Sequence, residues 1–275
     1  MIRIFKKWTI TDIIVNFILL LMALIAIVPF VYMVFTSLRQ VYTMTDFNFS
    51  LMDLNFENYK TILQKYPFPR YFMNTAIVVL ACCFLNVMFG ALAGYGFAKK
   101  KFPGRDKLFS LFLATMMIPG QVTMIPIFTI FTKLGLMNTY TALILPSVSA
   151  FGVFMMRQFI VSLPDELLEA ARLDGASEFQ IFTRIVLPLI KPTIISLTIY
   201  TFISAWNDFL WPLIIVSDEA HTTLTLGLST LTTVNATNYG LLMAGSTLTF
   251  VIPFLLYIFL QKQFQEGIAM SGVKG

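Results

Sequence analysis

Charged side chains are scarce in this sequence. Asp, Glu, Lys and Arg make up only 12% of the 275 residues, whereas hydrophobic residues make up 57%. The mean hydropathy is +0.80. Soluble domains carry about 25% charged residues, so this composition excludes an ordinary soluble fold. It indicates a protein that is built to lie in lipid.

Side chains that bind metals or form disulfides are also few. The only histidine, His221, has no second His or Cys at ligand spacing, so we expect no metal site. Cys82 and Cys83 are adjacent in an apolar run, where neighbouring residues do not easily bridge, and we assign them to packing. The nucleophiles, metal clusters or acid–base pairs of a membrane enzyme are not recognisable either. We therefore predict no catalytic residue in this chain.

The apolar residues form long runs of the length that crosses a bilayer, about 20 residues each. The first follows Arg3, Lys6 and Lys7 and is too long for a signal peptide, so we expect it to remain as a membrane helix. We predict an all-α polytopic membrane protein with a single transmembrane domain over 1–275. Its spans, about six in number, are placed near 13–38, 71–98, 107–134, 139–163, 187–216 and 243–260.

The third predicted span is the least regular. Pro119 and Pro126 interrupt it, and proline removes a helical hydrogen bond and clashes with the preceding turn. We expect a kink there.

Basic residues are distributed unequally between the two sides of the membrane. Fourteen of the 19 Lys and Arg residues fall on the side that holds both termini, Lys99–Lys107 and the segment 157–191. Because the more basic side is cytoplasmic, we predict that both termini are cytoplasmic. The basic residues flank apolar segments and form no patch interleaved with exposed aromatics, so the net charge of +5 does not indicate nucleic acid binding.

The cytoplasmic segment 162–192 is predicted to form two short helices joined at a glycine. Ser162 and Asp165 have the spacing of a capping box, and good helix formers continue until Gly175 supplies a left-handed end. Ser177 and Gln180 repeat the capping spacing, so a second short helix should follow.

One face of the first predicted helix favours close approach by another molecule. Leu167, Ala170, Ala171 and Asp174 lie near that face, and the alanines leave room for a partner. On spacing alone, the simpler interpretation is an amphipathic loop that lies along the membrane surface.

The same segment closely resembles the signature loop of ABC importer permeases, in which EAA is followed by G and then by I-LP. In that family the loop forms a coupling helix that seats in a cleft of the cytoplasmic ATPase subunit. The resemblance implies this role for the coupling loop 162–188. The matching residues are Glu169, Ala170, Ala171, Asp174, Gly175, Leu187 and Pro188.

Weaker matches along most of the chain are similar to the carbohydrate-uptake, maltose-type branch. They are NYKTIL from Asn58, GYGF from Gly94, MIPGQVTMIP from Met117, AWNDFLWPL from Ala205 and GVKG from Gly272. This resemblance implies sugar import across a bacterial cytoplasmic (inner) membrane by alternating access. The implied partners are membrane lipid, a second homologous permease, two ATP-binding subunits and an extracytoplasmic sugar-binding protein.

The chain has no G-x-x-x-x-G-K-[ST] loop to cradle phosphates, so energy must come from another subunit. The resemblance implies that ATP and Mg²⁺ are bound by the partner ATPase, with no cofactor in this chain. The alternative is an ion-coupled secondary transporter, which needs its own coupling groups in the membrane. Only Asp208 qualifies, and we detect no inverted repeat.

A polar and aromatic face is predicted on the fifth span. Thr201, Ser204, Asp208 and Trp211 recur at spacings of three and four. Sugars need hydrogen-bonding groups and aromatic platforms, so the candidates for a substrate path are Trp206, Asn207, Asp208 and Trp211. The alternative is that both tryptophans pack and that Asp208 caps a helix. In the second span, the Gly90 and Gly94 pair predicts close helix packing.

Overall fold

The structure is a computed structural model that describes residues 9–43, 51–231 and 238–272. The basic residues Arg3, Lys6, Lys7 and Lys274 and the final three residues of the GVKG match lie outside the described residues. Every regular element in the described part is a helix. Three helices are long and apolar enough to cross a membrane alone, and three bent pairs raise the number of candidate spans to six.

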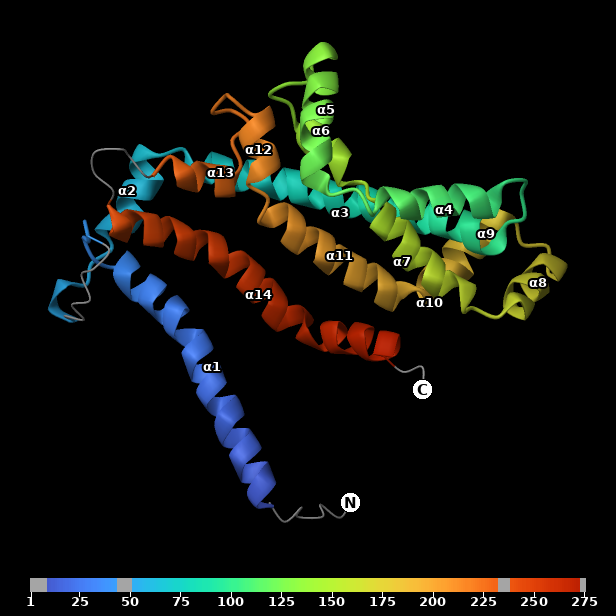
Figure 1. Cartoon of the computed structure of the whole chain (residues 1–275), viewed down its shortest axis with the longest axis horizontal. Coiled ribbons are helices and arrows are strands. Elements are labelled where there is room, and N and C mark those ends of the chain that lie inside the picture. Colours follow the sequence, from blue (N-terminus) through green and yellow to red (C-terminus); the bar gives the residue numbers. More distant parts are fainter. Residues whose placement is uncertain (1–8, 44–50, 232–237, 273–275) are drawn as a thin grey trace. The chain divides into compact units, whose positions relative to one another are not determined.

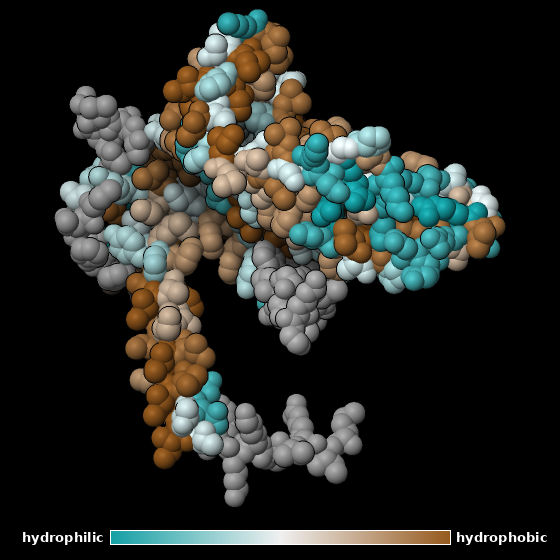
Figure 2. Space-filling view, turned by 45° about the vertical axis from the view of Figure 1, so that its right-hand side comes forward, coloured by the Kyte–Doolittle hydropathy of each residue, from teal (hydrophilic) through white to brown (hydrophobic). Residues whose placement is uncertain are grey.

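The three long helices are α1 (Ile10–Ser37), α3 (Phe68–Lys99) and the described part of α14 (Tyr239–Gly272). A capping box in which Thr9 and Asp12 exchange hydrogen bonds begins α1. The side chains of α1 are mostly exposed and apolar, as the brown surface of this helix shows (Figure 2). Such a surface needs lipid or another apolar partner around it.

The third span is broken. Its halves, α4 (Arg105–Thr115) and α5 (Gly120–Lys133), meet at 99°. Pro119 directly precedes α5 with an extended backbone, because proline cannot continue the hydrogen-bonding of the previous helix. The predicted kink is therefore confirmed.

The fourth span is bent more gently. It joins α6 (Tyr140–Ile144) and the short η2 (Leu145–Ser147) to α7 (Ala150–Val161) at 41°. Ser149 caps α7 by accepting a hydrogen bond from the Gly152 amide.

The fifth predicted span, 187–216, is not one continuous helix. The observed α11 (Lys191–Trp206) ends before Asn207, and a separate short helix, α12 (Leu210–Ile215), follows. The reason is local competition for backbone hydrogen bonds. The Asn207 side-chain amide donates to the Ile203 carbonyl at 2.8 Å, and an Asp208 side-chain oxygen accepts from the Trp211 backbone amide at 3.3 Å.

The chain forms two compact units, one within Met1–Pro67 and Leu228–Val251, the other within Phe68–Gly227 and Ile252–Gly275. In the first unit, η1 (Leu51–Asp53) precedes α2 (Glu57–Lys65). The buried Asn58 amide on α2 donates to the carbonyls of Ser37 and Arg39 at 2.9 and 2.7 Å. These bonds fix α2 against the end of α1.

The second unit is built on α3, α7 and α11, which lie side by side (Figure 1). Glycines allow α3 and α7 to approach closely. A Cβ added at Gly94 would lie 2.8 Å from the Met156 Cβ, and one at Gly90 would lie 3.1 Å from the Gly152 backbone. The predicted packing role of Gly90 and Gly94 is confirmed.

Candidate functional site

The predicted first cytoplasmic helix is α8 (Asp165–Leu173). The expected capping box at Ser162 is wrong, because the Ser162 hydroxyl donates back to the Phe159 carbonyl and ends α7. The residue that precedes α8 is Pro164, which makes no side-chain capping bond.

The end of α8 follows the prediction. Gly175 has a φ of +81°, the left-handed conformation that favours glycine. Its amide donates to the Arg172 carbonyl at 3.0 Å, and the Ala176 amide donates to the Ala171 carbonyl at 2.9 Å. These two bonds form a Schellman motif. Glycine is required here by backbone conformation, since nothing lies within 4 Å of an added Cβ.

The second predicted helix begins as expected. Ser177 and Gln180 form a capping box at α9 (Glu178–Ile181). A π-helical turn, η3 (Phe182–Val186), leads into α10 (Leu187–Leu189), and the segment from Glu178 to Leu189 meets α11 at 74°. Leu187 is half-buried and the neighbouring Pro188 is exposed at this bend.

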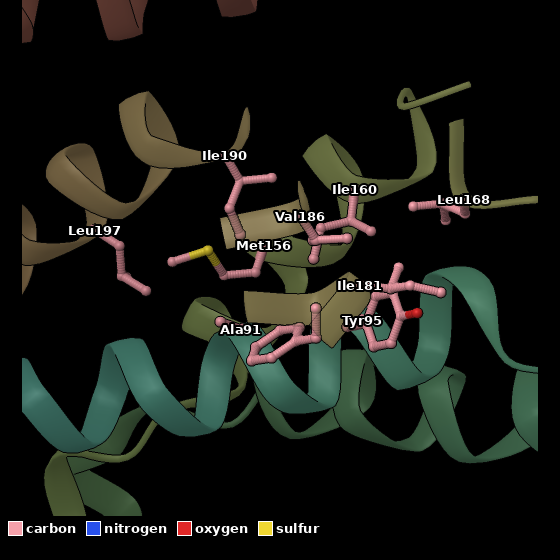
Figure 3. Packing of buried hydrophobic residues seen from close by; sticks show 10 residues of the cluster. Ala91, Tyr95, Met156, Ile160, Leu168, Ile181, Val186, Ile190 and Leu197 are labelled. Atoms are coloured by element: carbon pink, nitrogen blue, oxygen red, sulfur yellow. The ribbon is translucent and has the colours of Figure 1, made fainter. Parts of the chain in front are cut away.

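An apolar cluster anchors this loop to the rest of the second unit. Leu168 on α8 is 2% exposed and packs in a cluster with residues of α3, α7, α9 and α11, seen in Figure 3. Ala171 is half-buried against the same cluster. The cluster therefore holds one face of α8 and turns the opposite face outward.

The outward face of α8 is only partly the one expected from sequence. Glu169, Ala170, Asp174 and Gly175 are exposed, and Leu173 is 90% exposed. Ala171 points toward the internal cluster, so only Ala170 of the two alanines is on the open side. Hydrophilic residues gather over this end of the second unit (Figure 2).

Charged groups connect the loop to the end of α3, which the sequence analysis missed. Glu178 receives hydrogen bonds from Tyr95 and Arg172 and pairs with Lys100. The Lys100 ammonium contributes most to lowering the pKa of Glu178, to about 2. Lys99 pairs with Asp165 at 2.6 Å, and its hydrogen bond lowers the pKa of Asp165. In the sequence analysis, Lys99 and Lys100 served only to predict which side of the membrane is cytoplasmic.

A cavity of about 380 Å³ with a mixed polar and apolar wall lies farther along the second unit, in the size range of small-molecule sites. Its wall combines hydroxyl, amide, carboxylate and indole groups. They include Thr75 and Asn86 of α3, Gln121 of α5, Ser204 of α11, Asp208 and Trp211. The Thr223 hydroxyl, which also lines it, has no hydrogen-bond partner among the described residues.

The cavity contains two of the four residues predicted for a substrate path. Asp208 and Trp211 line it, and the Trp211 indole N–H donates to the Ala142 carbonyl at 2.9 Å. Trp206 is buried elsewhere, stacked on Phe202 at 5.4 Å, and Asn207 is exposed outside the cavity wall. All four residues of the predicted polar and aromatic face, Thr201, Ser204, Asp208 and Trp211, line the cavity, even though the helix is interrupted between Trp206 and Leu210.

Comparisons with known proteins agree on one family. Residues 86–269 match the family described as binding-protein-dependent transport system inner membrane component. The arabinooligosaccharides transport system permease protein AraQ of Halalkalibacterium halodurans is 41% identical over 206 residues, with 74% of each chain covered. The lactose transport system permease protein LacG of Rhizobium radiobacter is 32% identical, over 94% of this chain and 96% of LacG.

The fold also has solved counterparts. A chain of a bacterial ABC transporter involved in the import of the acidic polysaccharide alginate superposes with a TM-score of 0.82 at 25% identity, covering 94% of this chain and 99% of that one. These findings give no support to an ion-coupled transporter. Together with the several apolar helices, they establish a multi-pass membrane protein that belongs to the binding-protein-dependent inner-membrane components, the permease subunits of ABC importers.

Proposed function

We propose that this permease carries a sugar or oligosaccharide into a bacterial cell by alternating access, with the whole chain acting as one transmembrane permease domain. Support comes from relatives whose names specify arabinooligosaccharides and lactose, and from a solved counterpart that is involved in alginate import. The cavity adds chemical support, because hydroxyl, amide and indole groups suit a hydroxyl-rich substrate.

We further propose that α8 is the coupling helix. The observation that carries this proposal is the two-sided arrangement of α8. Leu168 is anchored in the internal cluster, while Glu169, Ala170 and the almost fully exposed Leu173 face away from it. An exposed leucine at the tip of a charged loop is suited to insertion into an apolar cleft of another protein.

The assembly would contain a second homologous permease, two ATP-binding subunits and an extracytoplasmic sugar-binding protein. ATP and Mg²⁺ would bind to the ATPase subunits, and this chain would perform no catalysis. Both termini and α8 would be cytoplasmic, as the distribution of basic residues indicates. Movement of the ATPase subunits would then reach the cavity through α8.

The docking role can be tested with matched substitutions in the assembled transporter. Leu173→Asp should reduce ATPase co-purification by about tenfold, because a carboxylate in an apolar cleft costs more than 1 kcal/mol. Leu134→Asp, at a 64% exposed position after α5, is the control and should retain the ATPase. Normal co-purification with Leu173→Asp would contradict docking through α8.

The substrate role of the cavity needs a separate test. Asp208→Asn keeps an oxygen for the Trp211 amide but removes the charge, and Trp211→Phe keeps a ring but removes the indole donor. Both should impair uptake of arabinooligosaccharides or lactose while the ATPase remains bound, whereas Asn16→Ala, at an exposed position on α1, should not. Wild-type uptake of every transported sugar by both cavity variants would contradict this assignment.

A further inference from the structure

Glu178 occupies the junction between the coupling loop and the long helix α3. One carboxylate oxygen accepts a hydrogen bond from the Tyr95 hydroxyl at 2.8 Å and lies 2.5 Å from the Lys100 ammonium. The other accepts from the Arg172 guanidinium at 3.0 Å. A single side chain thus binds the last turn of α8 to the end of α3.

The first turn of α8 is tied to the same place. Lys99, whose side chain is 6% exposed, donates to an Asp165 oxygen and to the Leu163 carbonyl, both at 2.6 Å. Asp165 begins α8 and Arg172 lies near its end. The first turn of α8 is therefore held to α3 directly, through Lys99, and its last turn indirectly, through Glu178 of α9, by charge-assisted hydrogen bonds, which are directional.

These ionic hydrogen bonds and the apolar cluster contribute differently to the placement of α8. Leu168 attaches α8 through hydrophobic contact, which is not directional. The ionic contacts fix the angle at which α8 lies and link it to one particular helix. Attachment and orientation are thereby assigned to different residues of the loop.

Helix α3 leads directly to the cavity. It is continuous from Phe68 to Lys99, and Thr75 and Asn86 on it line the cavity wall. Nine residues separate Asn86 from Tyr95, roughly 14 Å along the helix axis. An unbroken helix transmits a displacement over this length, so a rotation of α8 imposed from outside would reach the cavity through α3.

We infer that Glu178 is a positioning residue that transmits movement of α8 to α3 and hence to the cavity. The inference rests on the proposed coupling function and adds the route of transmission. It predicts that loss of Glu178 leaves the ATPase bound but weakens the response of the cavity to nucleotide.

The test follows the cavity itself and needs no known sugar. Ser204, which is exposed and lines the cavity, is replaced by Cys in a chain with Cys82→Ala and Cys83→Ala. The rate of labelling by an impermeant maleimide is measured in the full transporter, with and without a non-hydrolysable ATP analogue. Glu178→Gln should reduce the nucleotide-dependent change by about fivefold, with normal ATPase co-purification. Glu166→Gln, an exposed α8 carboxylate, is the matched control.

The outcomes separate this inference from the function beneath it. If the parent chain retains no ATPase, or its labelling does not respond to nucleotide, the coupling function itself fails. If nucleotide changes labelling of the parent and of Glu178→Gln equally, only the proposed role of Glu178 is overturned. Loss of the bound ATPase from Glu178→Gln would also overturn that role. Should Glu178→Gln not insert, Lys100→Gln with Arg172→Gln removes two of its partners and must weaken the response in the same way.

Discussion

The Asn86 side-chain amide of α3 donates a hydrogen bond to the Thr201 hydroxyl of α11, with the two atoms 2.9 Å apart. Its oxygen accepts from the amide and hydroxyl of Ser149, before α7, at 3.3 and 3.4 Å. Asn86 is 3% exposed. One buried amide therefore joins three helices at the wall of the cavity.

We expect Asn86→Leu to lower the stability of the purified transporter by about 1–3 kcal/mol, because it leaves the Thr201 hydroxyl and the Ser149 amide without this partner. Thermal unfolding in detergent measures the effect. Asn16→Leu is the control, since Asn16 is exposed and its amide bonds only within its own helix. Equal unfolding temperatures for the two variants would show that the Asn86 bonds contribute nothing.

Two glycines on α3 should respond in opposite directions to the same substitution. At Gly94 an added Cβ meets the Met156 Cβ at 2.8 Å and the Arg157 nitrogen at 2.9 Å, so Gly94→Ala should destabilise by about 1–3 kcal/mol. At Gly96 nothing lies within 4 Å, and Gly96→Ala should be neutral or stabilise by about 0.5–1 kcal/mol. The thermal unfolding temperatures of the two variants, compared with that of the parent protein, measure these changes. A Gly94→Ala protein as stable as the parent would refute close packing of α3 on α7.

Gly175 should tolerate residues according to backbone conformation. Because its φ is +81° and the space around it is open, Gly175→Val should cost about 1 kcal/mol or more and shift the turn that ends α8. Gly175→Asn, which accepts the left-handed region more readily, should retain more function. Sugar uptake per ATP hydrolysed is the measurement, with membrane insertion checked. Equal coupling in both variants would mean that this turn does not orient α8.

The orientation of the chain can be checked with introduced cysteines. In a chain with Cys82→Ala and Cys83→Ala, we expect an impermeant reagent applied to intact cells to label Glu57→Cys and not Lys101→Cys, because the basic loop is predicted to be cytoplasmic. Both positions are exposed, so access to the reagent depends on the side of the membrane. Permeabilised cells provide the control, in which both should react. The reverse pattern in intact cells would invert the topology.

Local sequence signals determined much of this protein. The apolar runs predicted the long helices, Pro119 predicted the break in the third span, and Ser177 and Gly175 predicted the turns within the segment 162–188. Each of these features depends on residues within a few positions of one another. Hydrophobic length, caps and backbone preferences can therefore be read from the sequence without knowledge of tertiary contacts.

Only the tertiary structure decided which side chains meet. Glu178 lies 78 positions from Lys100, and Thr201 lies 115 positions from Asn86. Periodicity could not reveal these pairs, because they exist only when separate helices pack. It did place Thr201, Ser204, Asp208 and Trp211 on one face, and all four line the cavity, whereas Trp206 lies on another face of α11 and packs against Phe202. The other walls of the cavity come from α3 and α5, which lie beside this face only because separate helices pack together.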